Sequence, residues 1–377
     1  MNHASPFRFG KVVTGDYFIN REEEIIRIQN NITNKINTVL ISPRRWGKTS
    51  LIRQIAQKTC NSRNRFVFID FYNIRTEEEF YNIYAQQVLR GSLTRVDEFL
   101  KAGRDFFKTI IPSISFSVDP QHDLSLKLNW NEVKKAKGEI INLPEIIAKK
   151  KKIQLNVCID EFQNIAKLEN YIQVEEDLRA HWQHHEHIAY CLYGSKRHMM
   201  SDIFNQESRP FYRFGDFIML DKIPKDHWIL FITRAFTNTG KQIDLAYSEK
   251  IIELADNHPD YIQQLCHHLW SLTDSEVDKD ILMSAVDLVL SSNVILYQET
   301  CENLSYTQIN LLKALVKGET QFTSNAVMNQ YRLGTPRNVW KNKKVLENKE
   351  IIDFHTENAY FVDPFFKYWF TEKFLRL

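Results

Sequence analysis

The chain has 377 residues, of which 43% are hydrophobic and 25% are charged. These proportions are typical of a globular protein, and the length predicts two or three domains of roughly 100–200 residues each. The formal net charge of +2 excludes a strongly basic or acidic protein, so any patch that binds nucleic acid or a membrane surface must be local.

The cysteines and the N-terminus bear on the cellular compartment. The five cysteines form no C-x-x-C pair, and Cys158 and Cys191 lie inside apolar runs, so we expect reduced, buried thiols. Residues 1–15 hold no apolar signal-peptide core, and no run reaches the roughly 18 apolar residues that a membrane span needs. We therefore expect a cytoplasmic protein without a membrane segment.

A helix is predicted to begin near residue 21. Asn20 can serve as its N-cap, the acidic residues 22–24 suit its first turn, and isoleucines up to position 36 give it a buried stripe. Arg21 and the backbone of Phe18 could lie beside an adenine ring, although the isoleucine stripe alone favours a helix that only packs.

The chain is organised around residues 37–53. An apolar strand at 39–41 leads through a turn into a helix at Lys48, and the pattern G-x-x-x-x-G-K-[ST] is met except that Ser42 replaces the first glycine. In such a loop, backbone N–H groups and the helix dipole bind phosphate, and glycine lets the backbone come close. Lys48 can reach the β- and γ-phosphates, and the Thr49 hydroxyl can ligate magnesium.

The alternative is a chance Gly-Lys-Thr in an ordinary strand-turn-helix. The predicted nucleotide-binding residues are Ser42, Pro43, Arg44, Arg45, Trp46, Gly47, Lys48, Thr49 and Ser50.

The next segment continues the alternation of strands and helices. A strand is predicted at 65–71 and a helix after it, with Thr76 as N-cap and Glu79 at the capping-box position. A helix follows at 99–111, a two-strand ribbon at 113–129 and a helix at 143–152. The lysine run at 149–152 is interpreted as a solvated helix end rather than a binding patch.

A further apolar strand, residues 153–159, ends in Asp160 and Glu161. In phosphate-loop enzymes the acid at the end of such a strand holds magnesium, and a following glutamate can polarise the attacking water. The alternative is that the strand simply ends in two solvated acids. The presence of Lys48 and Thr49 upstream makes this alternative less favoured.

Several polar residues follow the acidic pair. Histidines at 181, 184, 185 and 187 have no cysteine or acid that completes a metal site of known geometry. Ser195 comes directly after the strand at 187–193, so it is a candidate γ-phosphate sensor. Arg213 could reach a phosphate of its own or of a neighbouring subunit, or could only pair with an acid.

The fold class predicted from this order is α/β. Strands alternating with helices over residues 37–220 predict a mostly parallel sheet with helices on both faces, and a ligand at the carboxyl ends of the strands. From residue 224 to about 293 the pattern is helical only and predicts a small lid domain, in which His258 and Pro259 start a helix. The expected domains are residues 1–222, 223–300 and 301–377.

The C-terminal segment predicts a winged helix, because three helices are followed by a hairpin at 351–362. Residues 303–377 hold 11 Lys plus Arg against 7 Asp plus Glu, a net charge of +4. The third helix suits a duplex groove, and an intramolecular or protein-docking role is the alternative. The candidate DNA-binding residues are Arg337, Asn338, Lys341 and Lys344.

Taken together, these segments resemble the archaeal-type ATPase family of phosphate-loop proteins, which is also abundant in bacteria such as Bacteroidetes. The chain also resembles the signal-transducing ATPases with numerous domains and, more distantly, the archaeal replication initiators. It covers nearly the whole chain and rests on FINRE at 18–22, PRRWGKTS at 43–50, IDEFQ at 159–163, GS at 194–195, RPFYR at 209–213, HPDY at 258–261 and VDPFFKYW at 362–369.

The resemblance implies a P-loop, AAA+-like ATPase that binds ATP with Mg²⁺. Lys48 and Thr49 would fill the phosphate-loop roles, Asp160 the metal role and Glu161 the water role, while Pro259 would lie in a lid motif near the adenine. Two departures are Ser42 in place of the first glycine and the lack of a small residue before Pro259.

We expect an ATP-driven switch that hydrolyses slowly and whose lid couples nucleotide state to the winged helix. A DNA-binding protein in which ATP is structural or regulatory is the alternative, and a protein-interaction module of a defence system is a third option that nothing in the sequence selects. Whether the protein forms a nucleotide-dependent oligomer stays an open question. Arg44, Arg45 and Trp46 are larger than a phosphate loop requires, so we predict that they face outward or toward the lid or winged helix.

Overall fold

The structure is a computed structural model that describes residues 4–92, 116–119, 125–354 and 359–376. It divides into two compact units. One, the α/β unit, comprises Arg21–Arg44 and Lys48–Asp221, and the other, the helical unit, comprises Met1–Asn20, Arg45–Gly47 and Lys222–Leu377. Each unit is described by itself.

The α/β unit is built on a five-stranded sheet with the order β2-β5-β6-β1-β7. All four neighbouring pairs are parallel, as predicted. Central strands of a parallel sheet are covered on both faces, which explains why every residue of β1 and β6 is buried. The strands are β1 (Thr38–Ile41), β2 (Asn64–Asp70), β5 (Gln154–Asp160), β6 (Ile188–Gly194) and β7 (Asp216–Met219).

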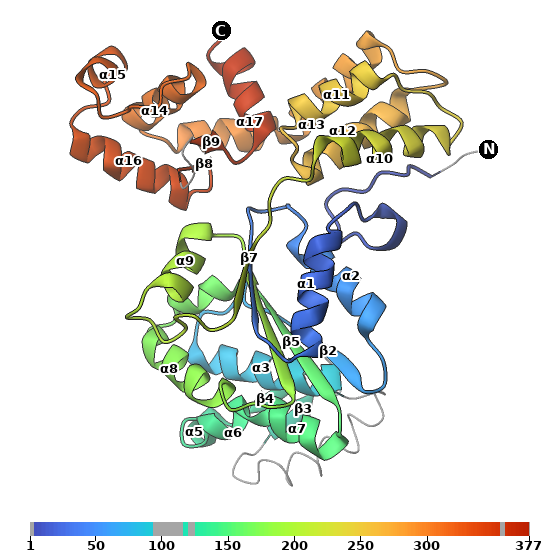
Figure 1. The fold of residues 1–377 in the computed structure, drawn as a ribbon. Coiled ribbons are helices and arrows are strands. Elements are labelled where there is room, and N and C mark those ends of the chain that lie inside the picture. Colours follow the sequence, from blue (N-terminus) through green and yellow to red (C-terminus); the bar gives the residue numbers. More distant parts are fainter. Residues whose placement is uncertain (1–3, 93–115, 120–124, 355–358, 377) are drawn as a thin grey trace. The chain divides into compact units, whose positions relative to one another are not determined.

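Helices cover both faces of this sheet (Figure 1). On one face, Ile28 and Ile32 of α1 (Glu22–Thr33) and Ile52 and Ile55 of α2 (Lys48–Thr59) line a small pocket together with Cys158 and Cys191. The alternate strand residues, such as Val157 and Leu192, belong to the main core on the other face. The helices of that second face and its surroundings are α3 (Glu77–Ser92), α5 (Trp130–Val133), α6 (Lys137–Ile141), α7 (Leu143–Lys151), α8 (Tyr171–Trp182) and α9 (Arg197–Asn205).

Several local predictions can be compared with the structure. The ribbon is present as β3 (Phe116–Asp119) and β4 (Ser125–Leu128), which pair antiparallel, whereas the helix expected at 99–111 lies outside the described residues. Thr76 caps α3 through the Glu79 amide at 3.2 Å, but the Glu79 carboxylate accepts from the Arg75 amide, so the capping box is incomplete.

The predicted Asn20 cap is wrong. Helix α1 begins at Glu22, and Arg21 occupies the N-cap position without a side-chain hydrogen bond. Asn20 and Arg21 have φ values of 54° and 73°, in the left-handed region, whereas a capping side chain needs an extended backbone. The Arg21 side chain instead forms an ion pair with Glu24, with Nη1 2.9 Å from the carboxylate.

The described part of the helical unit contains a first group of helices, α10 to α13, and then the elements predicted for a winged helix. The first group is α10 (Lys225–Thr237), α11 (Leu245–Leu254), α12 (Pro259–Leu272) and α13 (Lys279–Glu302). The second is α14 (Tyr306–Val316), α15 (Asn325–Gln330), α16 (Pro336–Asn348), the antiparallel pair β8 (Ile352–Asp353) and β9 (Tyr360–Phe361), and α17 (Pro364–Trp369), which continues into a π-helix at Phe370–Phe374. Ser305, Ser324 and Thr335 cap the three helices α14, α15 and α16.

The three expected domains stay a prediction, and two features bear on their boundaries. The N-terminal segment packs with the helical unit, since Phe7 is buried against Phe231 and Phe236. The boundary expected at 300/301 falls inside the last turn of α13, and one hydrophobic core extends from α10 to α17.

Helix α13 corrects the expectation about apolar length. Among the described residues it is the one helix long and apolar enough to span a membrane by length and composition. Polar residues such as Asp287 and Ser291 interrupt it, so its sequence contains no unbroken apolar run of that length. Its buried residues Leu282, Ala285, Val286, Val289 and Leu290 lie at helical spacing and belong to the unit's core.

Candidate functional site

The phosphate-loop sequence lies between β1 and the N-terminus of α2, as predicted. Gly47 has a φ of 91°, which a residue with a side chain rarely adopts. The buried Lys48 ammonium donates to the carbonyl oxygens of Ser42 at 2.9 Å and Pro43 at 3.0 Å. Ser42 itself is fully buried, so a small residue fits where the pattern has glycine.

Thr49 and Asp160 join the two predicted motifs. The Thr49 hydroxyl donates to Asp160 Oδ2 at 2.8 Å, and the other carboxylate oxygen accepts from the Glu161 amide at 2.9 Å. Burial raises the pKa of Asp160 to about 6, and the neighbouring Glu161 carboxylate adds to this, while the Thr49 hydrogen bond and the Lys48 charge oppose it. A hydroxyl and a desolvated carboxylate are the oxygen ligands that Mg²⁺ prefers, and a cation would offset the cost of the buried charge. These residues therefore fit a magnesium ion.

Glu161 follows β5 and lies beside the tip of β6. Its Oε2 accepts a hydrogen bond from the Ser195 hydroxyl at 3.1 Å and another from Gln163 Nε2. The register of the sheet pairs Ile41 with Gly194, so Ser195 lies next to the start of the phosphate loop. The structure thus brings together Lys48, Thr49, Asp160, Glu161 and Ser195. The sequence assigned no role to Gln163, and only its place two residues after Glu161 could have pointed to it.

Arg213 is not joined to this group by any contact of the described residues. It is exposed, its φ is 52°, and its guanidinium lies 5.2 Å from the Tyr212 ring centroid. The neighbouring Arg209 is the arginine that pairs with an acid, the fully buried Glu175. The predicted phosphate contact of Arg213 stays a prediction.

The predicted adenine-side residues belong to different units. Arg21 is buried in the α/β unit, and within the described chain its Nη2 has no hydrogen-bond partner. Phe18 is half-buried in the helical unit, and Pro259 is the first residue of α12 there. Their contact with a nucleotide stays a prediction.

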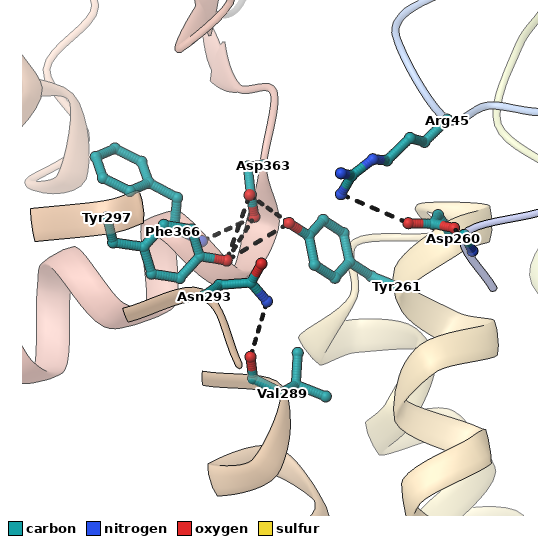
Figure 2. Close-up of polar contacts among 9 residues, drawn as sticks. Arg45, Asp260, Tyr261, Val289, Asn293, Tyr297, Asp363 and Phe366 are labelled. Carbon is teal, nitrogen blue, oxygen red and sulfur yellow. Dashed lines mark hydrogen bonds and ion pairs between the residues drawn. The ribbon is translucent and has the colours of Figure 1, made fainter. Parts of the chain in front are cut away.

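Two large residues of the loop contact the start of α12, which is one of the placements that the sequence left open. Arg45 and Trp46 are grouped with the helical unit. The Arg45 guanidinium lies 3.6 Å from the Asp260 carboxylate (Figure 2). Trp46 is buried, and its ring meets His258 edge-to-face at 6.3 Å. Arg44 is exposed.

A polar cluster, here called the Asp363 cluster, joins the buried Tyr261 and Tyr297 to the half-buried Asp363. Asp363 accepts hydrogen bonds from the hydroxyls of Tyr261 on α12 and Tyr297 on α13, and from the Phe366 amide at the start of α17 (Figure 2). Burial raises the pKa of the Asp363 carboxyl, although its hydrogen bonds oppose this. The cluster connects α12 and α13 to α17, which follows the hairpin of the predicted winged helix.

The predicted DNA-binding residues lie on α16 and are all exposed: Arg337, Asn338, Lys341 and Lys344. Trp340 is 64% exposed among them, and the Lys344 ammonium lies 5.3 Å from its ring centroid. Lys343 differs, since its ammonium lies within 5 Å of the Phe322 and Phe354 rings. The exposed basic residues therefore share a helix with one exposed tryptophan.

The histidines at 181–187 have structural partners at the opposite end of β6. His185 is placed between the Tyr190 hydroxyl and the Asn142 side chain, and burial lowers its pKa to about 4. His187 is hydrogen-bonded to the buried Glu145 at 2.8 Å.

Comparisons with known proteins agree with this architecture. A family model described as "ATPase domain predominantly from Archaea" matches residues 18–265, and one described as "Probable winged helix domain" matches residues 295–372. No curated protein matches the sequence at a significant level.

Solved structures show the same fold at low identity. A Walker-type ATPase of Pyrococcus abyssi is 16% identical, with a TM-score of 0.70 over 96% of this chain and 99% of that one. The ORC2 protein of Aeropyrum pernix, solved with ADPNP and ADP, is 12% identical, with a TM-score of 0.56 over 95% and 94%. The ORC1 protein of the same organism, solved with DNA, is 12% identical, with a TM-score of 0.50 over 93% and 91%. Because the first family model covers more than half of the sequence, the chain belongs to the family of ATPase domains found predominantly in Archaea.

Proposed function

We propose that the protein is a magnesium-dependent ATPase that acts as a nucleotide-controlled switch in the cytoplasm. The observation that carries this proposal is the 2.8 Å hydrogen bond between Thr49 and Asp160, which brings the phosphate loop and the acidic strand end to one point. Ser195 and Glu161 lie at the same edge of the sheet, where a parallel α/β fold binds its ligand.

Each residue has a distinct role in the proposed reaction. Lys48 and the N-terminus of α2 bind the β- and γ-phosphates, and Thr49 with Asp160 holds Mg²⁺, which neutralises charge on the phosphates. The Glu161 carboxylate accepts a proton from the water that attacks the γ-phosphate, and Ser195 holds that carboxylate in place.

The switch part of the proposal rests on the loop itself. Arg45 and Trp46 precede Lys48 by three and two residues and contact Asp260 and His258, so a change in loop conformation on nucleotide binding would alter the start of α12. The Asp363 cluster then links α12 to α17 and the winged helix.

Two substitutions test the site. Lys48→Ala should abolish ATP binding, and Glu161→Gln should keep binding and stop hydrolysis, as measured by nucleotide titration and phosphate release. Tight ATP binding by the Lys48→Ala protein would contradict the site assignment.

A second candidate function is binding of double-stranded DNA through α16, with ATP in a structural or regulatory role. The observation that favours it is the exposure of Arg337, Lys341 and Lys344 on one helix. Replacing Arg337 or Lys341 by alanine should reduce the slope of log affinity against log salt by about 1 each, whereas the exposed Lys317→Ala should not. Undetectable binding to mixed duplex at low salt would exclude this function.

A further inference from the structure

The side chain of Gln163 is fully buried beside the candidate general base. Its amide Nε2 donates to Oε2 of Glu161, the same oxygen that accepts from the Ser195 hydroxyl at 3.1 Å. Two donors from two different strand ends thus hold one oxygen of the carboxylate.

Gly194 provides the space that Gln163 occupies. A Cβ atom at this position would lie 2.0 Å from Gln163 Oε1 and 2.9 Å from Met200 Sδ. Its φ lies outside the left-handed region, so its backbone does not require glycine. The close approach of the amide is therefore the reason that only a residue without a side chain fits at the end of β6.

The backbone around Glu161 is fixed by its neighbours. Glu161 has a left-handed φ of 51° and precedes a short 3-10 helix at Phe162–Lys167. Phe162 is fully buried against Phe71 and Phe211, and the Asn164 amide donates to the Phe71 carbonyl oxygen at 3.3 Å. With the backbone fixed in this way, the remaining freedom of Glu161 lies in its side-chain torsions.

We propose that Gln163 is a positioning residue for ATP hydrolysis, which orients the Glu161 carboxylate so that Oε1 accepts the proton of the attacking water. This inference rests on the proposed ATPase function. A carboxylate ends in a broad, weakly restricted torsion, so hydrogen bonds to one oxygen are needed to aim the other. Because a misplacement of about 1 Å can cost on the order of a hundredfold in rate, loss of one of two donors should lower kcat by about tenfold.

The alternative is that Gln163 only fills space in the core. In that case its replacement would lower the melting temperature and affect ATP binding and turnover together. A positioning role instead lowers kcat and leaves the Kd for ATP unchanged, because the water-activating carboxylate does not hold the nucleotide.

The experiment compares Gln163→Met, which keeps the size of the side chain and removes the donor, with wild type in the full-length protein. Phosphate release gives kcat, and titration with a fluorescent non-hydrolysable ATP analogue and Mg²⁺ gives Kd. Gly194→Ala, which displaces the amide from a different residue, should reproduce the loss of kcat and serves if Gln163→Met does not fold. Gln154→Met is the matched control, since Gln154 lies at the other end of β5 and donates to Ile32.

A kcat of Gln163→Met and Gly194→Ala within about twofold of wild type, or above it, overturns the inference. A loss of kcat accompanied by a comparable weakening of ATP binding overturns it as well, because that result is expected if Gln163 only fills space. A wild-type protein that hydrolyses no ATP would instead overturn the proposed function, and this inference with it.

Discussion

Arg45 and Asp260 form an ion pair at 3.6 Å between the loop that precedes Lys48 and the first turn of α12. Arg45 is 60% exposed and Asp260 15%, so solvent screens the pair and its removal should change the free energy of unfolding by less than about 1 kcal/mol. Asp260 also accepts a hydrogen bond from the Gly10 amide at 3.1 Å. Asp260→Asn would remove the charge and can preserve this hydrogen bond.

We predict that Arg45→Ala separates stability from signalling. The variant should hydrolyse ATP at a rate near wild type, but hydrogen exchange of α12 should no longer respond to a non-hydrolysable ATP analogue. Lys225→Ala removes an exposed pair of similar kind, Lys225 with Glu249, and serves as the control. An unchanged exchange response in Arg45→Ala would show that this ion pair does not report the nucleotide state.

Replacing Thr49 should separate magnesium from ATP. Thr49→Val removes the hydroxyl that donates to Asp160, so Mg²⁺ should no longer stimulate hydrolysis, whereas Thr49→Ser should retain most of it. Thr59→Val at the other end of α2 removes a hydroxyl that donates to the Ile55 carbonyl oxygen and should have no such effect. The measurement is phosphate release against Mg²⁺ concentration, and a normal magnesium response of Thr49→Val would contradict the metal assignment.

The raised pKa of Asp160 has a defined effect on stability. In the nucleotide-free protein the folded-state pKa is about 6, against 3.8 for the ordinary group, so the folded state binds the proton more tightly than the unfolded state. Stability from this group is therefore full at low pH and falls as the pH rises from about 4 to about 6. The fall is on the order of 3 kcal/mol, since one pKa unit corresponds to about 1.4 kcal/mol.

Asp160→Asn should remove this dependence. In EDTA the melting temperature of the variant relative to wild type should increase between about pH 4 and pH 7, and ATP with Mg²⁺ should reduce the difference by stabilising wild type only. Asp70→Asn, at the exposed end of the neighbouring strand β2, is the control. A difference that does not vary with pH would contradict the environment described for Asp160.

Asp363 should matter more than an ordinary helix cap. Asp363→Ala removes the cap of α17 and leaves the Tyr261 and Tyr297 hydroxyls without their acceptor, so we expect a loss of about 2–4 kcal/mol. Asp278→Ala removes only the exposed cap of α13, at 2.8 Å from the Ile281 amide, and should cost about 1 kcal/mol. Chemical denaturation measures both, and equal losses would show that the tyrosines add nothing.

The sequence predicted features that are local along the chain. The strand, turn and helix around Lys48 and the strand that ends at Asp160 each carry their own pattern, and the parallel sheet follows from their alternation. Residues that act through packing with distant elements were missed. The buried position of Gln163 beside Glu161 depends on the space left by Gly194 on another strand, and a left-handed Arg21 has no sequence signal that displaces the expected Asn20 cap.

The same limit applies to the domain boundaries. No proline or glycine interrupts α13 near residue 300, so the helix continues past the expected boundary to Glu302. The role of Phe7 in the helical core depends on residues more than 220 positions away, which no local pattern can indicate.

The placement of residues 1–20 makes the α/β unit an insertion within the helical unit. The Arg8 amide donates to Gln263, a partner 255 residues later in the chain, so the N-terminal segment cannot complete its contacts until most of the protein has been synthesised. Domains generally fold as units in the order in which they leave the ribosome. The parallel sheet of the α/β unit can therefore form first, and packing of the N-terminal segment into the helical unit becomes a late step of folding.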